Sequence, residues 1–463
     1  DFNNDAHERY GLTQQDQMDN EHKEITLSHL IEFGTTQITT TGYYIEFERD
    51  WFKVNKIGGD GIDSVIDCAN TGNCEDDISS QADAIAVLHG EQAADIDIKH
   101  NNRSYESKGI QTRVKHQLET ASIDHGIEFG LRYHEDSEDR YQPTEIWAQD
   151  ANGNLTYAST SEPTKDSDTS LTKSKAWSAY LADDMKFGQW VVSPGVRHES
   201  YEIKREGSDT KVTEQDVTLF GLGTTYQINQ QILVFGGIHE GHSPAPNDGV
   251  TDPEEALNSE LGLRFNEENL YAETTLFYSD YSNLVGVCTA SGGAGDCNIG
   301  DASNAGEATI QGLEALFTYD HALNSAMTLP VGITYTYTDA TFDTTFEDDG
   351  VWGDVQKGDK LPNLAPHQVQ LRMGVAHVSG FSADMNVNYY SETCSTAACG
   401  ANEEIDAYSI VDIAGRYQIN SQTRVYATVE NVFNSEDVVA RAPKNGARAQ
   451  KPRSMLMGIA YNF

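Results

Sequence analysis

The sequence predicts an all-β protein, an antiparallel up-and-down transmembrane β-barrel with long outer loops and short periplasmic turns. Three observations support this fold class. Residues 453–463 alternate between two faces and end on an aromatic side chain. Short and long connections alternate between strand-like segments along the chain. All six cysteines lie in the long connections.

The final stretch has the pattern of a strand with two different faces. One face carries Met455, Met457, Ile459, Tyr461 and Phe463, and the other carries mostly small or polar residues. The last strand of an outer-membrane barrel must close against the first strand, with an apolar face toward lipid and aromatic side chains at the interface. A soluble β-sandwich is the alternative for this stretch alone, so the rest of the chain must decide.

Composition agrees with a membrane barrel but excludes membrane-spanning helices. The chain has 463 residues and a mean hydropathy of −0.54. It contains no run of 18 apolar residues, the length that a spanning helix needs. A barrel strand needs only alternate apolar residues, and long loops dilute the average. The 39 Gly and 22 Tyr against 11 Pro suit many strands with aromatic belts.

The charge is strongly acidic, with a formal net charge of −42. Nucleic acid is therefore excluded as a partner, because long-range electrostatics would repel it. Residues 1–20 are polar and contain no apolar core of a signal peptide. Either a leader was removed or the chain begins partway through a larger protein.

Alternating segments of strand length recur along the whole chain, and about 17 strands are expected. In the first, Ile25, Leu27, Ile31 and Phe33 alternate with more polar residues. Paired strands meet at short turns such as Phe187-Gly-Gln189. The expected strands are residues 25–33, 38–49, 104–117, 125–134, 174–186, 190–204, 212–227, 231–241, 256–265, 269–283, 305–319, 326–340, 367–378, 381–391, 405–418, 422–432 and 453–463.

The connections distinguish a membrane barrel from a sandwich. Short turns and long loops are expected to alternate without exception, as in a β-meander closed across a membrane. A sandwich has no reason for this rule. Residues 1–21, 50–101 and 135–173 are polar and are expected as outer loops. The polar face of the later strands is too hydrophilic for a packed core, which indicates a wide lumen.

The strand count predicts that part of the barrel is missing. Single-chain bacterial barrels close with an even number of strands. If the last strand ends on the periplasmic side, the first strand here runs inward and has no partner before it. The chain therefore has the pattern of the C-terminal part of a larger barrel.

The six cysteines form three close pairs, Cys68/Cys74, Cys288/Cys297 and Cys394/Cys399. Pairing between near neighbours is one of 15 connectivities, and it is favoured because each pair lies within one loop. Zinc is the alternative, but the sequence contains no C-x-x-C and no His at finger spacing. Disulfides imply an oxidising compartment.

Several motifs resemble those of a known family, the TonB-dependent outer-membrane receptors. Gly312-Leu-Glu314 resembles their "GLE" strand, Tyr426-Ala-Thr-Val-Glu-Asn-Val-Phe-Asn434 resembles their penultimate strand, and the terminal Gly458–Phe463 also fits. Within the family, two stretches resemble the ferric citrate receptor group. That similarity is carried by His239-Glu-Gly-His-Ser-Pro-Ala-Pro246, by Asp252–Phe265, and by the Arg441-Ala-Pro, Gly446-Ala-Arg448 and Pro452-Arg453 segments.

The resemblance implies a barrel of 22 strands, plugged by an N-terminal domain, in the outer membrane of a bacterium. Residues 1–463 would be the barrel domain alone, with the plug and about five strands preceding Asp1. The implied partners are a ferric chelate, the TonB complex through the absent N-terminal region, and outer-membrane lipid and lipopolysaccharide. Energy would come from the inner membrane, so no cofactor is expected.

Ferric citrate is anionic, so its site needs arginine or polar donors at the outer mouth. Arg441, Asn445 and Arg448 are the candidates in the last long loop. The alternative is that these arginines pair with the acidic surface or with lipid phosphates. Arg372 is expected on the polar face of its strand, where pairing with a neighbouring Asp or Glu is favoured.

His239 and His242 are further candidates for ligand contact, and no metal site is expected from this pair. No nucleophile–base arrangement is visible, so the protein is not expected to be an enzyme, including a barrel protease or lipase. Two alternatives to ferric chelate uptake stay open. One is a passive porin of 16 or 18 strands, and the other is a receptor for haem, cobalamin or an oligosaccharide.

Overall fold

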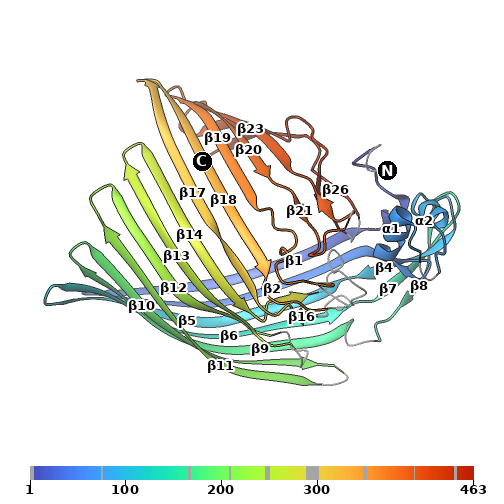
Figure 1. Cartoon of the computed structure of the whole chain (residues 1–463), viewed down its shortest axis with the longest axis horizontal. Helices are drawn as coiled ribbons and strands as arrows, with labels where there is room; N and C mark the ends of the chain where they lie inside the picture. Colours follow the sequence, from blue (N-terminus) through green and yellow to red (C-terminus); the bar gives the residue numbers. More distant parts are fainter. Residues whose placement is uncertain are drawn as a thin grey trace.

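The computed structural model describes residues 5–74, 77–164, 168–207, 210–245, 251–287, 302–347, 352–400, 402–442 and 446–462. Long antiparallel strands form one curved wall, in which each strand pairs with the next along the chain (Figure 1). A sheet of 21 strands contains this wall, and removing the four short strands β3, β4, β7 and β8 leaves 17. The fold is therefore the antiparallel up-and-down sheet that the sequence predicts.

Each of the expected strands overlaps one strand of the wall, so their existence and order are confirmed. Their bounds are β1 (Gln17–Phe33), β2 (Thr36–Ile57), β5 (Asn102–Thr120), β6 (Ile123–Tyr141), β9 (Thr169–Phe187), β10 (Trp190–Glu206), β11 (Lys211–Gln227), β12 (Ile232–Ser243), β13 (Glu254–Glu267), β14 (Leu270–Ser282), β17 (Ala308–Asn324), β18 (Met327–Phe342), β19 (His367–His377), β20 (Phe381–Tyr390), β23 (Tyr408–Gln418), β24 (Thr423–Glu430) and β27 (Ser454–Tyr461).

Side chains alternate between the two faces along each strand, and directly opposite residues of neighbouring strands share a face. Apolar residues therefore line up in rows on the outward face of the wall. One row runs in register across five strands and consists of Val114, Phe129, Leu181, Val196 and Phe220. Phe220 is 60% exposed and Leu181 is 49% exposed. A continuous row of exposed large apolar side chains is typical of a lipid-facing surface.

The first strands are longer than the sequence pattern indicates. β1 begins at Gln17, so residues 17–21 are strand and not loop. The prediction of strictly alternating short and long connections is also wrong at one place, because only residues 207–210 join β10 to β11. Pairing continues outward as far as Arg205 opposite Lys211, and this extension shortens the expected loop.

Residues 50–101, expected as a long polar outer loop, contain regular secondary structure. They contain β3 (Asp60–Gly61), helices α1 (Ile62–Thr71) and α2 (Gln81–Leu88), and strand β4 (Ala94–His100). Residues 135–173 are also largely strand: they include the end of β6, β7 (Thr144–Gln149), β8 (Leu155–Ser161) and the start of β9. β4 pairs with the outer end of β2 and with β7, which pairs with β8.

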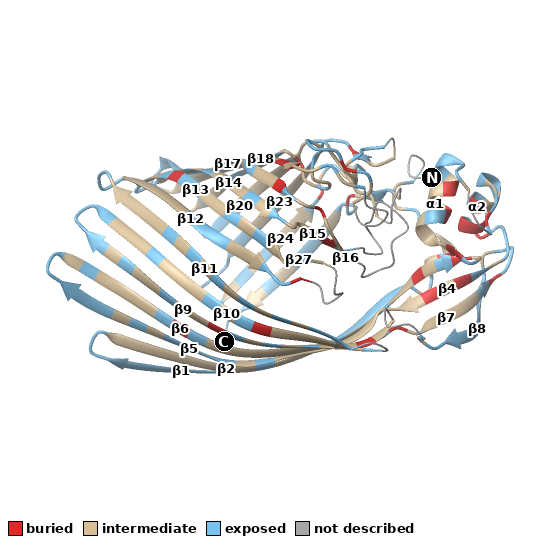
Figure 2. Ribbon diagram, turned by 60° about the horizontal axis from the view of Figure 1, so that its bottom comes forward, coloured by how far each residue is buried: buried red, intermediate tan, exposed pale blue. Residues whose placement is uncertain are grey.

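These elements form a small outer domain with the main hydrophobic core of the molecule. Ile57 and Ile96 are fully buried, and buried residues cluster beneath the two helices (Figure 2). The core consists of Leu12, Val54, Ile57, Val65, Cys68, Ile78, Ala84, Val87, Leu88, Ile96 and Ile98. Leu12 comes from the 3₁₀ helix η1 (Gly11–Thr13) before β1.

Helix α2 forms because its local sequence meets the requirements of a short helix. The Ser80 hydroxyl accepts a hydrogen bond from the Asp83 backbone N–H, which caps the N-terminus. Ala84, Val87 and Leu88 have the spacing of one helical face, and all three are buried. None of the described helices is both long enough and apolar enough to cross a membrane.

Two of the three expected disulfides are confirmed. Cys68 in α1 is bonded to Cys74, and Cys394 is bonded to Cys399 in the loop after β20. Cys288 and Cys297 lie outside the described residues. Short strand pairs shape the other outer loops: β15 (Val285–Val287) with β16 (Ala302–Asn304), β21 (Thr393–Cys394) with β22 (Glu404–Ile405), and β25 (Val438–Ala440) with β26 (Arg448–Ala449).

Candidate functional site

The inner face of the wall carries polar rows next to the apolar outer rows. One row places Thr39, Arg113, Gly130, Tyr180 and Arg197 in register on β2, β5, β6, β9 and β10. The adjacent row consists of Thr41, Gln111, Arg132, Ser178 and Glu199. Because these residues alternate with the apolar row, they face the lumen.

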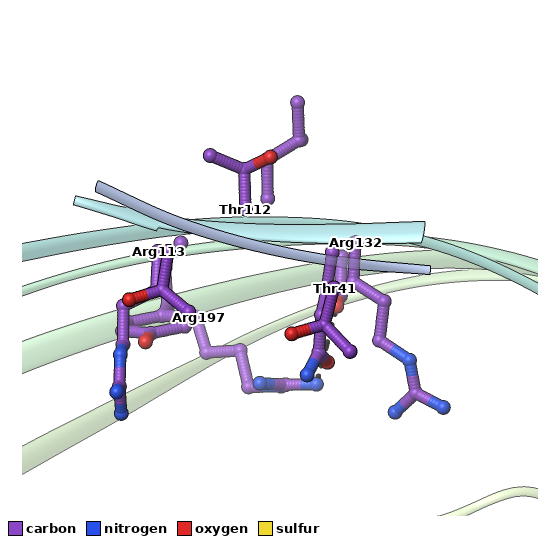
Figure 3. A pocket seen from close by; sticks show the side chains of 11 residues that line it. Thr41, Thr112, Arg113, Arg132 and Arg197 are labelled. Atoms are coloured by element: carbon purple, nitrogen blue, oxygen red, sulfur yellow. Dashed lines mark hydrogen bonds between the residues drawn. The ribbon is translucent and has the colours of Figure 1, made fainter. Parts of the chain in front are cut away.

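The two rows line a cavity of about 300 Å³, which we call the arginine pocket. Figure 3 shows the side chains of Arg113, Arg132, Arg197 and Thr41 on one side of the sheet, with Thr112 pointing away on the other side. The lining residues are Thr39, Thr41, Gln111, Thr112, Arg113, Gly130, Leu131, Arg132, Ser178, Tyr180 and Arg197.

Two glycines on the inner face, Gly130 in the pocket and Gly109 beside it, allow tyrosine rings of the neighbouring strands to lie across them. A Cβ atom at Gly130 would lie 2.0 Å from Cε1 of Tyr180, and one at Gly109 would lie 2.5 Å from the Tyr43 hydroxyl oxygen. No real side chain tolerates either distance. The rings therefore cross the neighbouring strand where it lacks a side chain, and Tyr180 reaches Glu128, to which its hydroxyl donates at 2.5 Å.

Arg132 is held by the side chains of Tyr43 and His134. Its Nε and Nη2 atoms donate to the Tyr43 hydroxyl oxygen at 3.1 and 2.8 Å, and the guanidinium lies over the Tyr43 ring. Because arginine can only donate, the hydroxyl accepts these bonds and is free to donate its own proton to Nδ1 of His134, 2.6 Å away. The Nη2 atom also lies 3.0 Å from Nδ1 of His134, and Nε2 of that ring lies 3.4 Å from a carboxylate oxygen of Asp136, so an acid is linked to Arg132 only through His134.

The other two arginines differ in how far they are compensated. Arg197 forms an ion pair with Glu199 and donates to the Ser178 hydroxyl at 3.2 Å. Arg113 has no hydrogen bond or ion pair to any residue that the structure describes. Arg113 and Arg132 therefore have no acid within ion-pair distance among the described residues, although Glu128 interacts electrostatically with Arg113 and the whole chain carries a net charge of −42.

The pocket lies within the membrane span. Arg113 is seven residues from the end of β5 (120 less 113), which corresponds to ~23 Å along the strand. A spanning strand uses about 9–11 residues. Walls of low dielectric constant strengthen electrostatic attraction there, and guanidinium forks match the geometry of carboxylates. The arrangement can therefore bind an anion that bears carboxylate groups.

The candidate residues of the last long loop lie elsewhere. Arg441 donates from Nε and Nη2 to the backbone oxygen of Glu404, at 2.9 and 2.7 Å, and so joins two outer loops. Arg448 is exposed on β26, opposite Ala440. Asn445 lies outside the described residues. A ligand contact by these residues stays a prediction.

His239 and His242 do not converge. Residues three apart in a strand point to opposite faces, and both lie on β12. The Nε2 atom of His242 is 2.9 Å from the Tyr201 hydroxyl, while His239 is exposed opposite Asn258. In the strand order of the wall, β13 to β24 lie between β12 and the loop that carries the β25–β26 hairpin. Their ligand contact also stays a prediction.

Arg372 pairs with an acid, as favoured by its sequence context. One of its terminal nitrogens lies 3.7 Å from a carboxylate oxygen of Asp384 on the neighbouring strand β20. The arginine pocket, by contrast, was not visible in the sequence. Its members come from five strands, and only the pairing register brings them together.

Comparison with known proteins agrees with this architecture. The model of the family "TonB dependent receptor-like, beta-barrel" matches residues 2–432. Among curated relatives, the metal-pseudopaline receptor CntO of Pseudomonas aeruginosa PAO1 is 23% identical over 377 residues, which cover 75% of this chain and 50% of that protein. The ferric enterobactin receptor of the same organism is 23% identical over 278 residues, which cover 53% of this chain and 35% of that protein.

Solved structures show the same fold. The unliganded ferric citrate transporter FecA superposes with a TM-score of 0.69 at 17% identity, covering 96% of this chain and 62% of FecA. The closed form of the ferric-catecholate import receptor Fiu from Escherichia coli K12 gives a TM-score of 0.74 at 16% identity, covering 99% of this chain and 66% of Fiu. The chain spans about half the length of the curated relatives that it matches over most of its own length. It belongs to the TonB-dependent receptor β-barrel family, whose members reside in the bacterial outer membrane.

Proposed function

We propose that this chain is the barrel of an outer-membrane receptor for TonB-energised uptake of an anionic metal chelate, with ferric citrate or a similar carboxylate siderophore as the cargo. The observation that carries the proposal is the arginine pocket. In a chain of net charge −42, neither Arg113 nor Arg132 forms an ion pair with an acid among the described residues, although the charge of Arg113 interacts with that of Glu128. The names of two curated relatives, a metal-pseudopaline receptor and a ferric enterobactin receptor, support a metal chelate as the cargo class.

The pocket residues would recognise the anionic chelate and guide it. Arg113 and Arg132 would each offer two parallel N–H donors to a carboxylate. Tyr43 holds Arg132 in place through two hydrogen bonds, so less conformational entropy is lost when an anion binds. The Thr39 and Thr41 hydroxyls would supply weaker donors on the same face.

The proposed partners follow from the same function. Energy would reach the receptor from the inner membrane through TonB, which would contact an N-terminal region of the complete receptor. The apolar outer rows would contact outer-membrane lipid, and the outer loops would contact lipopolysaccharide. No nucleotide or resident cofactor is needed for this form of transport.

Growth under iron limitation tests the proposed cargo. The complete gene product is expressed in a bacterium that lacks its own receptors, and single chelates are supplied as the iron source. Ferric citrate should support growth, and deletion of TonB should abolish it. Equal growth on an uncharged trihydroxamate chelate, or growth without TonB, would contradict the proposal.

A further inference from the structure

The His134 imidazole lies between Arg132 and an acid on the same strand. Its Nδ1 atom is 2.6 Å from the Tyr43 hydroxyl oxygen and 3.0 Å from Nη2 of Arg132. Its Nε2 atom is 3.4 Å from a carboxylate oxygen of Asp136, and the His134 side chain is only 20% exposed. Histidine is the side chain that ordinarily changes its charge near neutral pH. The protonation state of this ring therefore bears directly on the charge of the arginine pocket.

The contacts of the two ring nitrogens assign the tautomer. Arginine can only donate hydrogen bonds, so the contact with Arg132 requires a lone pair at Nδ1 of His134. The proton of the neutral ring is then on Nε2, the nitrogen that faces Asp136. The Asp136 carboxylate also accepts a hydrogen bond from the Ser174 hydroxyl, which holds the acid in place. In this arrangement His134 is a neutral acceptor for Arg132.

The residues directly opposite the ring on the neighbouring strands are uncharged. Opposite His134, β5 carries Gly109 and β9 carries Ala176. Strand β10, on the far side of β9, carries Tyr201 opposite Ala176 and Glu199 two residues away. In the described part of the chain, the charged or titratable side chains with a recorded contact to the ring are Tyr43, Arg132 and Asp136. A change in the charge of the ring therefore acts first on these three groups.

Protonation of Nδ1 would place a second positive charge against Arg132. The new N–H would replace an acceptor by a donor, so the 3.0 Å contact with Arg132 would become repulsive. Like charges so close together repel strongly where the surroundings have a low dielectric constant. The Tyr43 hydroxyl oxygen can accept the new N–H, and Asp136 compensates the ring from its other side. The contact with Arg132 is therefore the main obstacle to protonation, and it is the one that a bound anion can relieve.

A carboxylate bound to Arg132 would reverse this balance. It would neutralise the guanidinium charge, so the repulsion that opposes protonation of His134 would fall. The imidazolium would in turn add a positive charge close to the bound carboxylate. Anion binding and protonation therefore favour each other, and linkage requires the effect to be the same in both directions.

We propose that the arginine pocket binds a carboxylate anion together with a proton, and that the proton is taken up by Nδ1 of His134. His134 is then a positioning residue for Arg132 when the ring is neutral, and a source of positive charge when the anion is bound. This inference rests on the proposed function, because it concerns the same pocket and the same class of anion. It adds that the affinity for the anion rises as the pH falls.

Calorimetric titration with oxalate tests the proton uptake. Both carboxyl groups of oxalate are ionised throughout the range in which histidine titrates, so the probe itself contributes no proton. The complete gene product in detergent is titrated at pH ~6.5 in two buffers of different ionisation enthalpy, and the difference in heat gives the protons bound per anion. The wild type should take up ~0.5 proton per oxalate. Its affinity should rise at least ~5-fold from pH ~7.5 to pH ~5.5.

His134→Asn is the deciding variant, because its amide oxygen can accept hydrogen bonds in place of Nδ1 but cannot be protonated. It should take up less than ~0.1 proton, and its affinity should change less than ~2-fold with pH. His116→Asn is the matched control, since this β5 histidine contacts the Thr36 hydroxyl on the opposite face, 2.8 Å from Nδ1. It should behave as the wild type does. Lys357→Gln removes an exposed charge between β18 and β19, and should change the affinity less than ~2-fold at either pH.

Each outcome decides the question. Binding of oxalate without proton uptake, or equal uptake by the wild type and His134→Asn, would overturn the inference and leave the pocket as a carboxylate site. If His134→Asn does not fold, Asp136→Asn replaces it: loss of this acid disfavours the imidazolium, so uptake at pH ~6.5 should fall to less than about half, and unchanged uptake would overturn the inference. Failure of the wild type to bind oxalate would overturn the pocket and the inference together. If oxalate binds with a proton but iron is not taken up, the proposed transport function fails while the proton-linked site stands.

Discussion

At the scale of single residues, the pocket depends on glycines that the neighbouring rings require. Tyr180 and Tyr43 each lie across a strand at a glycine, and each then positions a charged group: Glu128 in one case and Arg132 in the other. Glycine in a strand is ordinarily unfavourable, so its presence at Gly130 and Gly109 indicates a steric role.

Gly130→Ala should destabilise the folded wall by about 1–3 kcal/mol, because the new methyl group would overlap the Tyr180 ring. Gly195→Ala on β10 is the matched control, since its nearest neighbour, the Ala182 Cβ atom, would be at an ordinary 3.8 Å. Urea unfolding in lipid vesicles measures both. Equal stability of the two variants would show that the ring does not occupy the space above Gly130.

Tyr43→Phe should slow uptake of the anionic chelate about fivefold, because Arg132 loses the acceptor of two hydrogen bonds. The adjacent Tyr44 is the control: its hydroxyl donates to Glu106 at 3.1 Å, on the opposite face of β2. Initial rates of radiolabelled iron uptake compare the two. A Tyr44→Phe effect as large as that of Tyr43→Phe would argue against a role for Arg132.

At the scale of elements, the wall could be predicted from the sequence and the outer domain could not. Wall strands alternate over many residues, so the pattern is strong even when single boundaries shift. Helices α1 and α2 are short and lie in acidic sequence, where Val65, Cys68, Ala84, Val87 and Leu88 give only one or two turns of periodicity. The Ser80 cap with Asp83 three residues later was the available signal.

The outer domain should respond to pH through Asp97 on β4. Burial raises the pKa of Asp97, with a further increase from Asp95 and an opposing effect of Lys56. An acid with a raised pKa favours the folded state when protonated, so its contribution is full below the unfolded pKa and is lost as pH rises through the folded pKa.

Asp97→Asn should therefore raise the stability of the outer domain at pH ~7, and the gain should shrink as pH falls through the raised pKa of the wild-type carboxyl. The exposed Glu91→Gln is the control. Hydrogen exchange of β4 and β7 amides measures the difference. A gain that persists at acidic pH would exclude ionisation of Asp97 as its cause.

At the scale of the whole molecule, fold class and family could be predicted from the sequence, whereas the geometry of the inner face could not. Thr39 and Arg113 are opposite each other although 74 residues separate them (113 less 39), and no sequence period reveals that pairing. Arg441 and Arg448 were visible as loop arginines because loop motifs are local. The predicted absence of plug and first strands stays a prediction.

The net charge of the whole chain and the local charge of the arginine pocket have opposite signs. The chain as a whole repels anions, with a formal charge of −42, but arginines are concentrated on the inner face of β5, β6 and β10. Charge focused in this way can select an anionic cargo in spite of the net charge. An anionic cargo is therefore the central claim.

Energised uptake of radiolabelled ferric citrate by the complete receptor tests that claim most directly. Arg113→Gln combined with Arg132→Gln should reduce the uptake rate at least ~10-fold, Lys357→Gln should leave it unchanged, and a protonophore should abolish it in every variant. Wild-type uptake by the double variant, or uptake that survives the protonophore, would contradict the account.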